Sequence, residues 1–219
     1  DTLRLVGREP TLLGQVLRIE AEGEVHRVQL PLIGAYQAAN ALTAAGLVIA
    51  TGGELRQVLA GLARLQPVRG RLERAVIAAS GAPVYVDYAH TPDALEAAIA
   101  ALKPHAGGRL IAVFGAGGDR DAGKRKPMGE VAAAHADVVI VTDDNPRGED
   151  AAAIRAQVLE GAPGAIEIGD RRSAIAAAIR MAGAQDIVLL AGKGHEQGQI
   201  VGDMVLPFDD VAVARECAA

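Results

Sequence analysis

The segment "DDNPRGED", residues 143–150, follows an apolar run and combines acids with an amide, a proline and an arginine. Asp144 and Asn145 could accept hydrogens from an ammonium group, and Arg147 could bind a carboxylate through two parallel hydrogen bonds. Pro146 restricts the backbone, so both groups could be held at once. The pattern therefore favours a zwitterionic ligand. A solvated turn would also explain it, because Asn-Pro is a common turn dipeptide and acids before a helix favour its dipole.

The segment "GAGGDRDAGK", residues 115–124, follows another apolar run. Arg120 offers a second planar fork for a carboxylate, and the glycines would let the backbone approach a ligand. The segment is not a dinucleotide fingerprint, since the third glycine would fall at Arg120. It is not a phosphate-binding P-loop either, since Arg125 stands where that motif requires Ser or Thr. A flexible glycine turn remains the alternative.

The segment "GKGHE", residues 192–196, sets Lys193, His195 and Glu196 in a glycine frame after a third apolar run. Glu196 could serve as a second acid for an ammonium group. A lone histidine is usually structural or solvated, and no second His or Cys stands at metal-binding spacing, so we expect no metal site here.

The segment "DYAHTPD", residues 87–93, follows a fourth apolar run. Thr91 and Pro92 have the types expected for the N-cap and first residue of a helix. Helix capping alone leaves Asp87 and His90 unexplained. Asp87 could accept a ribose hydroxyl, as acids at strand ends do in nucleotide-binding folds.

These four segments all follow predicted strands. The strand-like runs alternate with Ala-rich helical segments, and the runs are apolar on both faces, which indicates a parallel sheet covered by helices on both sides. We therefore predict a three-layer α/β sandwich. The carboxyl ends of parallel strands form the crevice where ligands bind, so the four segments should converge on one site. The predicted strands are residues 83–88, 109–115, 137–143, 165–168 and 186–192, and the predicted helices are Pro92–Leu102, Pro127–His135, Ala151–Leu159 and Arg171–Ala182.

The first third of the chain has a different pattern. Residues 15–30 alternate apolar and polar types around Glu22-Gly23, which predicts a β-hairpin. Residues 34–53 have helical spacing and end in two glycines, and a second helix is predicted over Leu55–Leu62. Pro67 and Gly70 separate these elements from the α/β part, so we place a domain boundary there.

Composition excludes several classes of function. The chain has 219 residues, 50% of them hydrophobic, which suffices for a sizeable core. Its net charge is −5 and aromatic residues make up only 2%, so neither the basic surface nor the stacking platforms of nucleic-acid binders are expected. Cys217 is the sole cysteine, which excludes a disulfide framework and fits the reducing cytoplasm. The longest apolar runs fall short of the ~20 residues that cross a membrane.

Six ordered motifs resemble those of the Mur ligase family, and in particular of its members that add the third peptide residue in peptidoglycan synthesis. The resemblance runs over nearly the whole chain. It implies an ATP-dependent ligase with three domains, of which residues 1–66 would be the end of the central ATP-binding domain. Residues 67–219 would be the complete C-terminal, amino-acid-binding domain, with a Rossmann-like fold and a mostly parallel sheet. The motifs are "LIGAYQAANAL", "PVRGRLE", "VDYAHTPDAL", "GAGGDRDAGKR", "DDNPRGED" and "GKGHEQGQ".

The resemblance also implies two sets of binding residues. For meso-diaminopimelate, which carries a zwitterion at its far end, they are Arg120, Asp144, Asn145, Pro146, Arg147, Gly192 and Glu196. For ATP, they are Asn40, Arg71, Asp87 and His90. Members that add L-lysine lack an arginine at the position of Arg147, since lysine has no distal carboxylate.

The reaction that the resemblance implies uses ATP and Mg²⁺ to convert the glutamate carboxylate of UDP-MurNAc-L-Ala-D-Glu into an acyl phosphate. The amino group of diaminopimelate then attacks it. No Gly-Lys-Thr phosphate motif occurs in the sequence. We therefore expect no catalytic residue and no metal ligand here, and no activity from this chain alone. We also expect a cytoplasmic monomer whose partners are small molecules, not nucleic acid or membrane.

Two alternatives stay open. Another ligase of the same superfamily, such as a folylpolyglutamate synthase or a cyanophycin synthetase, would share the fold but is not expected to carry both "DNPR" and "GKGHE". A non-catalytic amino-acid-binding module would use the same site without an activated acyl group.

Overall fold

The computed structural model describes residues 3–219 and divides into two compact units, one up to Pro67 and one from Val68. The division falls within the segment that contains Pro67 and Gly70.

The first unit consists of a three-stranded antiparallel sheet and two helices. The predicted hairpin is confirmed, since Ala21 pairs with Glu24 across a two-residue turn. Glu22 and Gly23 both have positive φ angles, 52° and 82°, which gives the turn the twist that matches two paired strands. The elements are β1 (Arg4–Thr11), β2 (Gly14–Ala21), β3 (Glu24–Leu30), α1 (Ala35–Ala50) and α2 (Leu55–Leu62).

Strand β1 was not predicted. It contains Gly7 and Pro10, two residues that lower strand propensity, and its pairing with β2 shifts register between Leu5 and Gly7. The core of this unit lies between the sheet and the two helices. It is formed by Leu17, Ile19, Val28, Leu30, Leu32, Ala38, Ala41, Ala45, Leu59 and Leu62.

The second unit contains a six-stranded sheet in the order β4-β5-β9-β6-β7-β8. All neighbours are parallel except β4, which is antiparallel to β5. Every residue of β5, β6 and β9 is buried, as expected for strands covered on both faces. The strands are β4 (Glu73–Ile77), β5 (Pro83–Asp87), β6 (Leu110–Phe114), β7 (Val138–Val141), β8 (Ile166–Glu167) and β9 (Ile187–Ala191).

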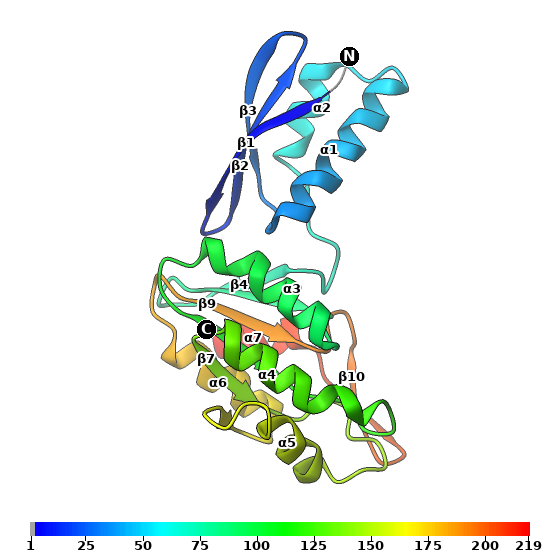
Figure 1. The fold of residues 1–219 in the computed structure, drawn as a ribbon, viewed down its shortest axis with the longest axis vertical. Coiled ribbons are helices and arrows are strands. Elements are labelled where there is room, and N and C mark those ends of the chain that lie inside the picture. Colours follow the sequence, from blue (N-terminus) through cyan, green and yellow to red (C-terminus); the bar gives the residue numbers. More distant parts are fainter. Residues whose placement is uncertain (1–2) are drawn as a thin grey trace. The chain divides into compact units, whose positions relative to one another are not determined.

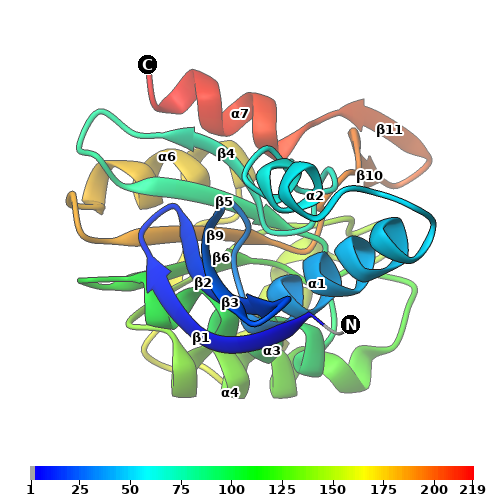
Figure 2. The ribbon, with the colours of Figure 1, turned by 90° about the horizontal axis from the view of Figure 1, so that it is seen from above.

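The predicted three-layer arrangement of this unit is confirmed. Helices α3, α4 and α5 cover one face of the sheet, and α6 and α7 cover the other (Figures 1 and 2). Thr91 caps α3 as predicted, because its Oγ1 accepts a hydrogen bond from Ala94 N at 3.3 Å. The helices are α3 (Pro92–Leu102), α4 (Arg125–His135), α5 (Ala151–Leu159), α6 (Arg171–Met181) and α7 (Asp210–Cys217), with short 3₁₀ turns at Lys103–His105 and Ala122–Lys124.

Several elements of the second unit were not predicted. They are the edge strand β4, helix α7 and a separate hairpin formed by β10 (Gly198–Val201) and β11 (Met204–Pro207). The hairpin follows directly after the glycine-rich segment 192–196, so it adjoins the carboxyl end of β9.

Candidate functional site

The loops after β5, β6, β7 and β9 converge at the carboxyl edge of the sheet, as predicted. They enclose a cavity of about 480 Å³. It is lined by Tyr88, His90, Thr91, Gly117, Arg120, Asp121, Lys124, Asp144, Asn145, Arg147, Gly192 and Glu196.

Most of the predicted ligand residues lie in this cavity. Pro146 does not line it; its carbonyl oxygen instead accepts a hydrogen bond from Glu149 N at 3.1 Å. Asn40 lies exposed on α1 in the first unit, where its Nδ2 donates to Gln37 Oε1 at 3.4 Å. The predicted residues that line the cavity are His90, Arg120, Asp144, Asn145, Arg147, Gly192 and Glu196.

Arg147 has an unusual backbone conformation for a residue with a long side chain, with a φ angle of 52°. Hairpin β10–β11 holds it there, since Arg147 N donates to Ile200 O at 3.0 Å and Gly202 N donates to Arg147 O at 2.7 Å. The side-chain Nη1 donates to Gly118 O at 2.9 Å. Within residues 3–219, Nε and Nη2 of Arg147 have no hydrogen-bond partner, so they are available to a carboxylate.

Arg120 is the second guanidinium of the cavity. Its side chain is exposed, and Nη1 donates only to the neighbouring carbonyl of Asp119, at 3.2 Å. Arg120 is therefore less constrained than Arg147 and keeps most of its donors for a ligand.

Asp144 has a protein cation beside it, which was not predicted from the sequence. Asp144 is 7% exposed, and its Oδ1 lies 3.2 Å from Nζ of the fully buried Lys193. The role of Asp144 as an acceptor for a ligand ammonium stays a prediction. Two more exposed acids also line the cavity, Glu196, whose side chain is 34% exposed, and Asp121.

Two glycines of segment 115–124 pack closely against the loop that follows β7. A Cβ atom on Gly118 would stand 1.9 Å from Pro146 O, and one on Gly115 would stand 2.3 Å from Thr142 O. Among the glycines of this segment, only Gly117 lines the cavity. The prediction that these glycines let the backbone approach a ligand is thus corrected for Gly115 and Gly118, which instead let two loops meet.

Lys124 is a third cation of the cavity that sequence reasoning missed. Its Nζ donates to His90 O at 2.8 Å. Burial lowers the pKa of Lys124, although Asp144 and Asp121 act in the opposite direction. Its place in the same glycine-rich segment as Arg120 was the signal that could have pointed to it.

Rings and a guanidinium gather at the Tyr88 side of the cavity. The Tyr88 ring centroid lies 4.6 Å from that of His90 and 5.1 Å from that of His195. The Arg71 guanidinium lies 5.0 Å from the Tyr88 ring, within the range of a cation–π contact. The predicted nucleotide residues Arg71 and His90 thus both lie next to Tyr88.

Asp87 supports the backbone around these rings. Its Oδ2 accepts from Leu72 N at 2.8 Å and its Oδ1 accepts from Ala89 N at 2.9 Å. Burial raises the pKa of Asp87, and these two hydrogen bonds oppose the rise. The contact between Asp87 and a ribose hydroxyl stays a prediction.

Two further features of the described residues bear on function. Within residues 3–219, no three His, Cys, Asp or Glu side chains lie close enough together to hold a metal ion. In the same part of the chain, each helix is too short or too polar to cross a bilayer.

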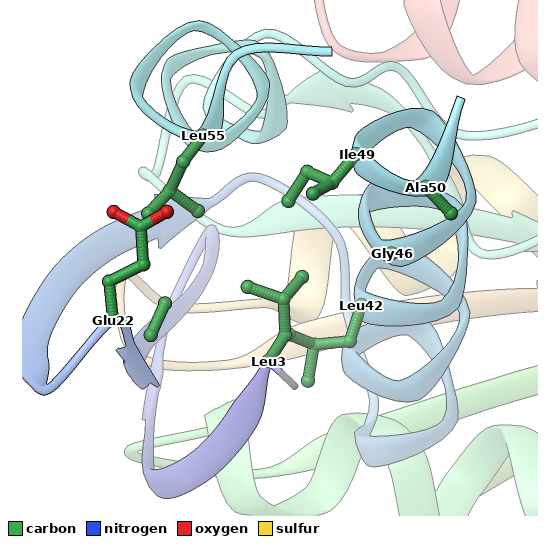
Figure 3. A pocket seen from close by; sticks show the side chains of 8 residues that line it. Leu3, Glu22, Leu42, Gly46, Ile49, Ala50 and Leu55 are labelled. Atoms are coloured by element: carbon green, nitrogen blue, oxygen red, sulfur yellow. The ribbon is translucent and has the colours of Figure 1, made fainter. Parts of the chain in front are cut away.

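A second cavity, of about 340 Å³, lies in the first unit between the sheet and helices α1 and α2 (Figure 3). Its lining is mostly apolar and includes Leu3, Leu42, Ile49 and Leu55. Glu22 is the sole ionisable side chain of that lining. This cavity of the first unit lacks the converging charges found in the cavity of the second unit, so we assign no chemistry to it.

Comparison with known proteins bears on the family. Residues 70–194, more than half of the chain, match the Mur ligase, glutamate ligase domain. The chain belongs to the Mur ligase family. Its members of known structure share its mixed α/β architecture, and one solved "UDP-N-acetylmuramoyl-L-alanyl-D-glutamate--2,6-diaminopimelate ligase" superposes with a TM-score of 0.81 at 36% identity. That alignment covers 99% of this chain and 45% of the solved one.

Two curated Mur ligases are similar to this chain over most of its length. The one from Zymomonas mobilis subsp. mobilis is 62% identical, over 99% of this chain and 45% of the relative. The one from Caulobacter vibrioides is 59% identical, over 96% of this chain and 43% of the relative. Both are named "UDP-N-acetylmuramoyl-L-alanyl-D-glutamate--2,6-diaminopimelate ligase". The chain thus spans less than half the length of the Mur ligases it matches.

Proposed function

We propose that this chain is part of an ATP-dependent amide ligase that adds meso-diaminopimelate to UDP-MurNAc-L-Ala-D-Glu in peptidoglycan synthesis, in the cytoplasm. The names of its relatives from Zymomonas mobilis and Caulobacter vibrioides support this proposal. The observation that carries it is the charge arrangement of the second unit's cavity. Two guanidinium groups, Arg120 and Arg147, face the same cavity as the carboxylate of Glu196.

The far end of meso-diaminopimelate fits this arrangement, because its last stereocentre bears one carboxylate and one ammonium group. Arg147 has two nitrogens free for a planar, two-point contact with the carboxylate. Glu196 and the neighbouring Asn145 form the acidic and polar wall for the ammonium. Lysine lacks the carboxylate, so it would leave the arginines without a partner and bind less well.

The chain's own part in the reaction is then to position the amino acid. ATP, when bound to the whole enzyme, phosphorylates the glutamate carboxylate and so supplies a phosphate leaving group. The unprotonated amine at the near end of diaminopimelate forms the amide bond, releasing inorganic phosphate and a proton. By holding the far end, Arg147, Arg120 and Glu196 would point that amine at the acyl group, which raises its effective concentration.

Four residues are proposed for the nucleotide. Arg71 and His90, beside Tyr88, together with Asn40 and Asp87, would contact the adenosine part of ATP. The described residues hold no acidic cluster suited to Mg²⁺, so we assign no step through Mg²⁺ to this chain. We propose residues 1–66 as the end of the ATP-binding domain and residues 67–219 as the amino-acid-binding domain. The chain alone is then expected to be inactive.

A competition experiment tests the proposal. The whole protein is given ATP, Mg²⁺, UDP-MurNAc-L-Ala-D-Glu and equal amounts of meso-diaminopimelate and L-lysine, and the products are read by mass. We expect the diaminopimelate product to dominate. Arg147→Ala should reduce the preference by about 10- to 100-fold, since hydrogen bonds between charged groups contribute about 1.5–3 kcal/mol.

Arg172→Ala is a suitable control for this variant. Arg172 is an exposed arginine on α6 that pairs with Glu216, outside the cavity. It should leave the preference unchanged. Equal incorporation of lysine and diaminopimelate by the unmodified protein would contradict the proposed substrate.

A further inference from the structure

We infer that Lys193 is a positioning residue of the amino-acid site: its buried ammonium orients Asn145 and Glu196 so that Glu196 presents an oxygen to the substrate's ammonium group. This inference rests on the proposed function, which supplies an amino acid with a charged distal end as the substrate class. Lys193 does not line the cavity and is not expected to touch the substrate.

The surroundings of Lys193 are those of a structural cation at the centre of several loops. Its side chain is fully buried. Nζ donates to Asn145 Oδ1 at 2.9 Å, to Gly198 O at 2.8 Å and to Asp144 Oδ1 at 3.2 Å. A lysine ammonium has three donors, so its hydrogen-bonding capacity is used in full inside the protein.

The amide of Asn145 can adopt only one orientation in this network. Its Oδ1 receives Lys193 Nζ and also the backbone N–H of Ile200, at 2.9 Å. Both partners are donors, so the atom between them must be the oxygen. The Nδ2 group is thereby directed at Glu196 Oε2, to which it donates at 2.9 Å.

Glu196 is fixed in consequence. Its Oε2 accepts from Asn145 and lies 3.7 Å from Lys193 Nζ. Among residues 3–219, no hydrogen bond reaches Oε1. Because Glu196 lines the cavity, this second oxygen is the one left for a ligand.

The charges of the cluster are shared with cations around it. Lys193 contributes one positive charge, and Asp144 and Glu196 contribute one negative charge each. Asp144 also interacts with Lys124 on the cavity wall, and both acids interact with the buried Arg171. Glu196 Oε1 is therefore singled out for a substrate ammonium by its place on the cavity and its lack of a protein donor within residues 3–219, and not by an excess of negative charge.

Hairpin β10–β11 connects this cluster to the arginine side of the cavity. In the hairpin, Gly198 O accepts from Lys193 Nζ and Ile200 N donates to Asn145 Oδ1. Gln199 Nε2 donates to Asp144 O at 2.7 Å. The same hairpin holds the backbone of Arg147. The positions of the ammonium-binding and carboxylate-binding groups are thus set by one element, which would keep their separation constant.

The test replaces Lys193 by Met, which removes the ammonium but fills the buried space. In the whole protein, KM is measured separately for meso-diaminopimelate, ATP and UDP-MurNAc-L-Ala-D-Glu, together with thermal unfolding. If Lys193 positions Glu196, Lys193→Met raises the diaminopimelate KM by about 10- to 100-fold and leaves the ATP KM within about twofold. Lys103→Met, which removes an exposed lysine paired with Asp137, is the matched control and should change none of these values.

The direction of the change separates positioning from simple electrostatics. If Lys193 only offset the negative charge, its removal would favour an ammonium ligand and lower the diaminopimelate KM. An unchanged or lower KM in a folded Lys193→Met protein would therefore overturn the inference while leaving the proposed function intact. Failure of the unmodified protein to use diaminopimelate would overturn both.

A second variant covers the case in which Lys193→Met does not fold. Asn145→Asp keeps an acceptor for Lys193 and Ile200 but cannot donate to Glu196. We expect it to raise the diaminopimelate KM by a similar factor with an unchanged ATP KM. Wild-type kinetics in Asn145→Asp would contradict the proposed link between Lys193 and Glu196.

Discussion

Two of the three fully buried Arg and Lys side chains in the second unit, Arg171 and Lys193, differ in what surrounds them. Arg171 is paired with the fully buried Asp210 through two hydrogen bonds, of 2.8 and 2.6 Å, and Nη2 also donates to Ala191 O at 2.9 Å. Lys193 instead contacts two acids, one of which, Glu196, is partly exposed to the cavity.

This difference indicates that Arg171 supports the fold and that Lys193 supports the binding site. The Arg171–Asp210 pair is closed: each charge has its counterion, and the pair joins α6, α7 and the end of β9. Burial opposes the charged form of Arg171, but Asp210 outweighs it, so the pKa of Arg171 is raised. The Lys193 cluster is open, since Glu196 lines the cavity and its Oε1 accepts no hydrogen bond within residues 3–219. Breaking the closed pair should therefore affect stability, whereas changing the open cluster should affect ligand binding.

Breaking the closed pair should have the largest effect. Arg171→Met leaves Asp210 as a buried, uncompensated charge, which we expect to lower the free energy of unfolding by about 3–5 kcal/mol. Urea denaturation followed by circular dichroism measures it.

The double variant Arg171→Met/Asp210→Leu is the control for that experiment. It removes both charges, and buried pairs replaced by apolar residues often retain stability. Recovery of most of the lost stability is expected. A double variant as unstable as the single one would show that the contact between Arg171 and Ala191, and not the ion pair, stabilises this region.

Removing the charge of Glu196 should affect binding more than stability. Glu196→Gln removes the carboxylate charge while keeping the shape of the side chain. We expect the KM for meso-diaminopimelate to rise by about 10- to 100-fold, with the free energy of unfolding within about 1 kcal/mol of the original. Steady-state kinetics and urea denaturation give the two values, and a large stability loss without a change in KM would reverse the roles assigned to the two clusters.

The smallest effect is expected at a third pair, Arg109–Asp186, on the opposite edge of the sheet from the cavity. Burial favours the neutral form of Asp186, but hydrogen bonds from Arg109 and from Gly183 N outweigh it and lower its pKa to about 2, from an ordinary 3.8. Between these pH values the unfolded chain binds more protons than the folded one. The stability that this carboxylate provides is therefore full above about pH 4 and is lost as the pH falls toward 2.

Asp186→Asn tests this linkage. The variant should show a weaker dependence of the unfolding free energy on pH between about 4 and 2, measured by urea denaturation at several pH values. The kinetics at neutral pH should not change, since Asp186 lies away from the cavity. An unaltered pH dependence would show that the contact with Arg109 does not lower the pKa of Asp186 in solution.

Much of the fold was predictable because its signals are local. The Glu22-Gly23 turn, the Thr91-Pro92 helix start and the strands apolar on both faces depend on residues close in sequence, and the structure has all of them. Hairpin β10–β11 was missed although its signal was present, since Gly202-Asp203 separates two short apolar runs. Strand β4 carried no such signal, because a short edge strand is defined by its partner more than by its own pattern.

The sequence was enough to predict which polar segments meet at the site, since segments that follow parallel strands lie at one edge of the sheet. The pairing of their charged groups could be seen only in the folded chain. Lys193 and Asp144 are 49 residues apart in the chain, and a lysine between two glycines would ordinarily be expected in solvent. Burial and counterions depend on contacts between distant segments, so only the folded chain distinguishes Asp144, which is 7% exposed, from Glu196, whose side chain is 34% exposed on the cavity.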